Sequence, residues 1–275
     1  MRLCKWSITD ESAVGKVAEC ETRPHFSKQP EEAILLQMGS NILHTPTVVP
    51  SEMLAEYRTH CVWNLQWQNI ALRLHKSLAQ KQGTVFNISE VSSPASPGSP
   101  RTSDESRTLS PEVVAIAVLR MQVKSSTVCL AGAFSPLESI YDAFNPVFDD
   151  IVSLAEEIHS SYAGGYHFDF GIIPPLHITA MKCRHRTIRR RAISLLATTP
   201  FKEGVFDSTC CYQIATWFMG VEEDGVETEV IPEHRRLSTK ESSLDMPRRR
   251  VHLQATNRKN AEDTELQWHE TTIQW

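Results

Sequence analysis

Five arginines form the sharpest polar feature of the chain: Arg184, Arg186, Arg189, Arg190 and Arg191. A guanidinium group is a planar fork of donors that pairs bidentately with carboxylates and phosphates. The cluster could therefore anchor neighbouring helices through intramolecular ion pairs, dock an acidic partner, act as a nuclear import signal or contact nucleic acid. The carboxylates that we expect to pair with it are Glu138, Asp142, Asp149 and Asp150.

The overall charge argues against a general nucleic-acid binder. The 275 residues include 28 Lys and Arg and 33 Asp and Glu, which gives a formal net charge of −5. Affinity for a phosphate backbone depends on a cationic surface that displaces counterions. We therefore expect any polyanion contact to be local and expect this chain not to bind DNA directly.

A short triplet, Asp169-Phe170-Gly171, spells the metal-binding motif of protein kinases. No glycine-rich phosphate loop precedes it, and no catalytic-loop motif lies upstream. We interpret the triplet as a turn in which Asp169 caps backbone amides, with Phe168 and Phe170 on alternate sides filling the core. A kinase active site is not predicted.

Other catalytic and metal-binding patterns are also missing from the sequence. There is no G-x-S-x-G elbow for a nucleophilic serine. The seven cysteines are an odd number without C-x-x-C pairs, which favours free thiols in a reducing compartment. We expect the protein not to be an enzyme and to bind no metal and no cofactor, while the sequence leaves any small-molecule effector unknown.

The segment before residue 111 is rich in serine and proline. Four serines directly precede a proline, and each could be phosphorylated by a proline-directed kinase: Ser93, Ser96, Ser99 and Ser110. Tracts of this composition are also common in disordered chain, so regulation is one interpretation and a plain linker is the other.

Helices must position these groups, and their boundaries are marked by proline, glycine and capping residues. Pro174 and Pro175 suit the first turn of a helix, because proline lacks an amide hydrogen and its φ is already helical. A second helix should follow His185, with one apolar stripe and with Arg189 and Arg190 facing a basic outer surface. Asp207 is placed to cap a further helix that runs to about residue 221.

An earlier helix is predicted between residues 51 and 81. Trp63, Trp67, Ile70, Leu74 and Leu78 recur at steps of three or four residues, which places them on one face. Such a stripe is usually core. The sequence also predicts that Gly83 ends this helix, and that Ser110 and Pro111 begin the next one.

The tail changes from helical to alternating patterning. Apolar and polar residues alternate over 251–256, and a second strand-like run covers 266–275, so we expect a β-hairpin docked on the helices. The predicted fold class is all-α with this small C-terminal hairpin. We divide the chain into a loosely ordered lead (1–50), a helical segment (51–88), a disordered serine-proline insert (89–110), the main helical domain (111–224) and a loop with the hairpin tail (225–275).

No unbroken run approaches the roughly 18 apolar residues of a membrane-spanning helix. The first 30 residues also lack the basic start and apolar stretch of a secretory signal. We expect an intracellular protein without membrane contact.

Several blocks in order resemble the C-terminal regulatory region of fungal transcription factors of the binuclear zinc cluster (Zn2Cys6) family. The blocks are YDAFNPVFDDIVSLAEEI from Tyr141, FDFGIIPPLHITAMKCRHRTIRRRAISLL from Phe168, KEGVFDS from Lys202, the helix ending at VEEDG, RRRVHLQA from Arg248 and LQWHETTIQW from Leu266. The resemblance extends from about Leu65 onward. The six cysteines that hold two zinc ions in this family, and the basic segment beside them, are absent from this chain.

The resemblance implies a nuclear, protein-facing regulatory module without its own DNA-binding head. It would act through a full-length transcription factor or the transcription machinery, or as a fragment of a longer factor. The alternative is a non-catalytic interaction scaffold in the cytoplasm.

Overall fold

The computed structural model describes residues 51–89, 109–135, 137–161, 165–167, 171–198, 200–262 and 265–275. Within these ranges the chain is mostly helical, with antiparallel strands near the C-terminus. The broad fold class predicted from the sequence is therefore confirmed. The predicted turn at Asp169, the core positions of Phe168 and Phe170, and residues 1–50 lie outside the described residues.

The first described element is α3 (Ser51–Ser89), a helix of 39 residues that lies along α4 (Pro111–Ala131). The two helices run antiparallel, because Tyr57 contacts Phe134 while Asn64 bonds to Val123. The helix continues past Gly83, so the predicted end at this glycine is wrong. A single glycine costs a helix only about 1 kcal/mol, which neighbouring helical residues can offset.

Helix α4 begins as its sequence predicts. Ser110 is the N-cap, its hydroxyl accepts a hydrogen bond from the Val113 amide, and Pro111 takes the first turn. At the other end the Tyr141 ring occupies the space that a side chain on Gly132 would need. By length and composition alone α4 could cross a membrane, a property shared by helices at the centre of a protein core. Here α4 packs against α3, α5 and α6.

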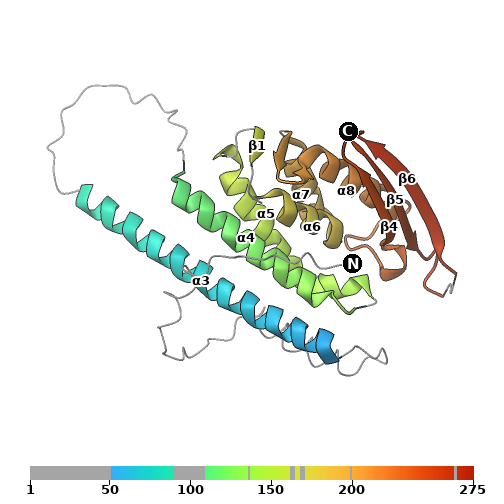
Figure 1. The fold of residues 1–275 in the computed structure, drawn as a ribbon, viewed down its shortest axis with the longest axis horizontal. Helices are drawn as coiled ribbons and strands as arrows, with labels where there is room; N and C mark the ends of the chain where they lie inside the picture. The colour runs from blue at the N-terminus through green and yellow to red at the C-terminus, as the bar shows by residue number, and fades with distance from the viewer. Residues whose placement is uncertain are drawn as a thin grey trace.

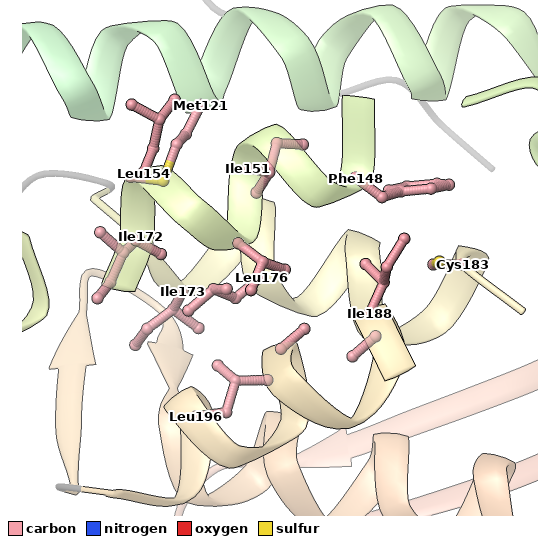
Figure 2. Packing of buried hydrophobic residues seen from close by; sticks show 14 of the residues in the cluster. Met121, Phe148, Ile151, Leu154, Ile172, Ile173, Leu176, Cys183, Ile188 and Leu196 are labelled. Carbon is pink, nitrogen blue, oxygen red and sulfur yellow. The ribbon is translucent and has the colours of Figure 1, made fainter. Parts of the chain in front are cut away.

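The main core lies between α4 and the next three helices, which are α5 (Asn145–Ile158), α6 (Ile173–Lys182) and α7 (Arg186–Thr198). Figure 2 shows Phe148 and Ile151 of α5, Leu176 of α6 and Leu196 of α7 converging on one apolar interior. Pro174 and Pro175 lie in the first turn of α6, as predicted. The short 3-10 helices η1 (Glu138–Phe144) and η2 (His159–Ser161) flank α5.

A small sheet that the sequence patterns did not predict crosses the end of these helices. Its strands are β1 (Gly165–His167), β2 (Phe201–Glu203) and β3 (Phe206–Asp207), with β1 parallel and β3 antiparallel to β2. Strands of two or three residues are too short to show an alternating pattern. The sheet brings Glu203 to the beginning of α6.

Helix α8 (Ser208–Glu223) links the helical body to the C-terminal sheet. Asp207 caps it as predicted, since its carboxylate accepts hydrogen bonds from the amides of Thr209 and Cys210. After η3 (Glu233–Arg235), the sheet is built from β4 (Ser238–Asp245), β5 (Arg250–Asn257) and β6 (Gln267–Gln274) in that order. All neighbours are antiparallel.

The predicted hairpin is present as β5 and β6, and β4 adds a third strand. Val251, Leu253 and Ala255 point toward α8 and form a second apolar cluster with Phe218 and Leu237. Strand β4 was missed because STKESSLD has almost no apolar residues, and nearly all of the strand is exposed at the sheet edge. Edge strands need not carry the alternation that marks half-buried strands.

Candidate functional site

Two of the five arginines in the predicted basic surface are fully buried. Arg184 lies between α6 and α7, Arg189 lies in α7, and their exposed fractions are 1% and 0%. The prediction that Arg189 faces an outer surface is therefore wrong. Arg189 and Ala192 lie on the same helical face as Leu196, all three are buried, and the arginine forms part of the core-facing stripe.

The two buried arginines share a carboxylate partner, which is Glu222 in α8. Arg184 Nη2 lies 2.8 Å from Glu222 Oε1, and Arg189 Nη1 lies 2.6 Å from Glu222 Oε2. Glu222 is also fully buried and accepts a hydrogen bond of 2.7 Å from the Leu237 amide. This Glu222 triad (Arg184, Arg189 and Glu222) joins α7, α8 and the entry to the C-terminal sheet.

The two guanidinium groups differ in their electrostatic surroundings. Burial alone would lower the pKa of Arg184, but the carboxylates of Glu222 and Glu138 raise it above its usual range. Glu138 Oε2 lies 3.3 Å from Arg184 Nη2. Burial lowers the pKa of Arg189, and repulsion by Arg184 acts in the same direction, despite the attraction of Glu222 and Glu223. Glu222 is the main compensating charge for Arg189.

The Glu222 carboxylate is held ionised by its surroundings. Burial by itself would raise the pKa of this carboxyl, but Arg184, Arg189 and the Leu237 amide lower it below the ordinary value of 4.5. A buried charge is tolerated only when it is paired and hydrogen-bonded. The Glu222 carboxylate is both paired and hydrogen-bonded, so it meets this condition. The arrangement is that of an ion-pair network that stabilises the fold.

Glu222 was missed as a partner, although the sequence carries a signal for it. Cys211, Ala215 and Phe218 are buried on one face of α8, and Glu222 follows Phe218 by four residues. A carboxylate on an apolar helical stripe indicates a buried counter-ion. The acids expected to pair with the arginines all precede the cluster in the chain, whereas Glu222 follows it.

The other three arginines are partly exposed and are also paired. Arg186 and Arg190 contact Glu223, and Arg191 Nη2 lies 2.7 Å from Glu156. Arg191 also pairs with Asp149, as expected for that acid. Any import or docking role for the cluster therefore falls to Arg186, Arg190 and Arg191.

Of the predicted acids, Asp142 and Asp150 have other partners. Asp142 accepts a bidentate pair from the buried Arg236, with distances of 2.9 and 2.7 Å, and Asp150 pairs with Lys124. Glu233 in η3 accepts hydrogen bonds from the amides of Glu138 and Ser139, which begin η1. These contacts bind the segment after α8 to the helical body.

A buried carboxylate also anchors the beginning of α6. Glu203 in β2 accepts hydrogen bonds of 2.8 to 2.9 Å from three successive amides, those of Gly171, Ile172 and Ile173. The amides at a helix start have no partner within the helix, and the helix dipole favours a negative charge there. Sequence spacing alone did not indicate this partner, because Glu203 lies about 30 residues away.

The predicted phosphorylation sites are placed only in part. Ser93, Ser96 and Ser99 lie outside the described residues. Ser110 is exposed at the N-terminus of α4, where a phosphate would meet the positive end of the helix dipole.

Metal ligands and reactive thiols do not cluster in the described ranges. No group of three or more His, Cys, Asp or Glu side chains there could hold a metal ion. The described cysteines are free thiols, namely Cys61, Cys129, Cys183, Cys210 and Cys211. Burial raises the pKa of Cys183 and of Cys210 to about 11, so neither thiol is activated at neutral pH.

The outer face of α3 is the main exposed apolar feature of the helical body. The prediction that the tryptophan stripe lies in the core is wrong: Trp63 is 50% exposed and Leu74 is 43% exposed. The face that packs on α4 instead uses Tyr57, Asn64 and Ala71. Two members of the apolar stripe, Trp63 and Leu74, are therefore exposed, whereas Trp67, Ile70 and Leu78 are half-buried.

Polar contacts hold α3 on α4. Asn64 Nδ2 donates to the Val123 carbonyl at 3.2 Å, and Thr127 Oγ1 donates to Asn64 Oδ1 at 2.8 Å. Gln68 Nε2 donates to Thr127 Oγ1 at 2.7 Å. These bonds specify how the two helices align.

A shallow hollow of about 390 Å³ lies on this outer face. It is lined by Arg58, Thr59, Val62, Trp63 and Gln66. Val62 is 56% exposed beside it, and the Trp63 and Trp67 rings are in edge contact at 5.8 Å between centroids. An exposed tryptophan beside an apolar hollow is typical of a contact surface for another polypeptide.

The fold and these sites define a mostly helical protein whose helical body is tied to a C-terminal antiparallel sheet by buried ion pairs, with an apolar face on its outermost helix. Comparison of the chain with family models, curated proteins and solved structures gave no match.

Proposed function

We propose that this chain is a non-catalytic protein-interaction module that regulates transcription in the nucleus of a fungal cell. The observation that carries the interaction role is the exposure of Val62, Trp63 and Leu74 on α3, while a partly polar face of the helix packs on α4. The transcriptional role is supported by the ordered blocks that resemble the regulatory region of zinc cluster factors. In this role the chain acts through a protein partner and does not itself bind DNA.

The energetics of α3 favour a partner on its outer face. Burying apolar surface stabilises a complex by roughly 25 cal/mol per Å² before the costs of association are subtracted. Tryptophan is enriched among residues that dominate binding energy, because it buries a large area with little loss of conformational entropy. Trp63 is about half exposed at the centre of this face, so it is the residue with most to gain from a partner.

A cytoplasmic scaffold is the second candidate function, because burial of two arginines weakens the basic cluster as an import signal. Arg184 and Arg189 are buried, which leaves three partly paired arginines for recognition by an import receptor. An import signal is usually an exposed basic stretch. The same α3 face would serve a scaffold equally well.

A tethering experiment tests the proposed function. The full chain is fused to a heterologous DNA-binding domain, and transcription of a reporter carrying its sites is measured in fungal cells. We expect the fusion to change reporter output severalfold in either direction, and Trp63→Ser to abolish the change. Trp268→Ser is the matched control, because Trp268 is 62% exposed on the C-terminal sheet, away from α3.

Localisation separates the two candidates. A tagged wild-type chain is expected in the nucleus, and an Arg190→Gln/Arg191→Gln variant is expected to shift toward the cytoplasm. A cytoplasmic wild-type chain together with an inert tethered fusion would overturn the transcriptional role and favour the scaffold.

A further inference from the structure

The side of α3 that faces away from α4 can be traced residue by residue. Positions that follow one another at alternating steps of three and four lie along one line of a helix. Along this line opposite the α4 contact lie Glu52, Ala55, Thr59, Val62, Gln66, Asn69 and Arg73. Trp63 and Ile70 flank the line, and the hollow described above lies at its centre.

This side of α3 carries groups that complement each other in the antiparallel direction. The register that aligns Glu52 with Arg73 also aligns Thr59 with Gln66, and it brings Ala55 and Val62 of the line against Ile70 and Trp63 beside it, while Asn69 falls opposite Glu56. The pairs that it places opposite each other are Glu52 with Arg73, Ala55 with Ile70, Thr59 with Gln66, and Val62 with Trp63. The first pair is ionic, the third is polar, and the other two are apolar.

We infer that α3 is the interface of a two-fold symmetric homodimer, in which two copies of α3 pack antiparallel about an axis near Val62 and Trp63. This inference rests on the proposed role of α3 as an interaction surface and names a second copy of the chain as its occupant. A two-fold interface uses the same patch on both subunits, so each Trp63 enters the hollow of the partner copy. Each Glu52 meets an Arg73, and the ion pair therefore occurs twice.

Charge decides the direction of the pairing. A parallel arrangement would set Glu52 against Glu52 and Arg73 against Arg73, and like charges in contact are destabilising. Both residues are exposed. Their charged groups are therefore accessible for pairing across the interface.

The described elements leave room for the second copy beside α3. From Glu52 to Arg73 the helix spans roughly 32 Å at about 1.5 Å per residue, and packed helix axes lie about 8–10 Å apart. Figure 1 shows α3 on the outside of the molecule, with α4 on one side of it and α5 to α8 beyond α4. The other labelled helices of each subunit therefore lie on the far side of its own α3.

Analytical ultracentrifugation of the purified full chain tests the inference over a range of concentrations. Wild type is expected to approach twice the chain mass as concentration rises. Glu52→Arg and Arg73→Glu are each expected to weaken the dimer about tenfold, because each change replaces two attractive contacts with two repulsive ones. The Glu52→Arg/Arg73→Glu swap is expected to restore wild-type affinity to within about twofold, since it restores both pairs.

Two further variants locate the contact. Trp63→Ala is expected to abolish the dimer, and Trp268→Ala is the control with equal loss of an exposed tryptophan. Circular dichroism of every variant confirms folding, which the exposed positions of the charges should leave intact. A wild-type chain that stays monomeric at all concentrations overturns the inference. In that case the occupant of α3 would be another segment of the chain, such as residues 1–50, or a different protein. A dimer that neither single charge reversal weakens overturns it as well.

The reporter experiment keeps this inference separate from the proposed function. A monomeric wild type whose reporter effect depends on Trp63 would overturn self-association and retain α3 as a surface for another protein. A dimer that responds to the charge swap, combined with an inert fusion, would support self-association and overturn the transcriptional role.

Discussion

The Glu222 triad makes a sharp prediction about stability. In Glu222→Gln the side chain keeps its shape and can still accept the hydrogen bond from the Leu237 amide, but it loses its charge. Arg189 then keeps its hydrogen bond of 2.9 Å to the Ala180 carbonyl but loses its ion-pair partner, whereas Arg184 retains Glu138. Removing one member of a buried ion pair typically costs about 3–5 kcal/mol. We expect a loss in this range, against a total stability of about 5–15 kcal/mol for a typical domain.

Urea denaturation at neutral pH, followed by circular dichroism, measures this loss. Glu156→Gln is the matched control, because it makes the same chemical change in an ion pair whose glutamate side chain is 42% exposed. Exposed pairs contribute about 1 kcal/mol or less. A shift in the denaturation midpoint without a change of slope would identify the effect as one on stability.

The pH dependence supplies an independent check on the same residue. The pKa of Glu222 is lower in the folded chain than its ordinary value of 4.5. Its contribution is therefore fully present above that value and is lost as the pH falls through the lower folded pKa. The gap in stability between wild type and Glu222→Gln should shrink only below about pH 4.5. A loss under about 1 kcal/mol at neutral pH would refute the reasoning that the two arginines depend on this carboxylate.

Two further predictions concern other buried groups. Glu203→Ala removes the acceptor of three amides at the start of α6 and should cost about 3 kcal/mol in urea denaturation, while Glu241→Ala on the exposed β4 should cost almost nothing. Burial lowers the pKa of His177 from 6.5 to about 4, and its buried Nδ1 has no hydrogen-bond partner among the described residues. Since the unfolded chain takes up the proton first, wild type should lose about 2–3 kcal/mol as the pH falls from 6.5 to 4, and His177→Gln should flatten this part of the profile. Equal slopes for the two chains between those pH values would contradict the assignment to His177.

Helix starts were the part of the fold that the sequence specified most directly. Ser110 with Pro111, Pro174 with Pro175, and Asp207 each lie where a helix begins. Capping depends on a few neighbouring residues, so the information is local. Gly83 shows the limit of local reasoning, because a residue that often ends helices here lies within one.

Tertiary contacts determine which face of α3 and of α7 is buried. In α3 the larger apolar residues predicted the wrong inner face, because Asn64 and Gln68 form hydrogen bonds with α4 that no single-helix pattern reveals. In α7 the same kind of reasoning placed Arg189 outside, although a partner 33 residues away makes its burial possible.

The sequence by itself determined the mostly helical class, the main helix starts and the two alternating strands of the tail, because these depend on periodicity and on neighbouring residues. It also identified the arginine cluster as the site of strongest charge. Only the tertiary structure decided which arginines are buried, that Glu222 and Glu203 compensate charges and amides from distant segments, and that Trp63 and Leu74 of α3 are exposed. The physical reason is that the cost of burying a polar group depends on its partner, and the partner is supplied by the fold.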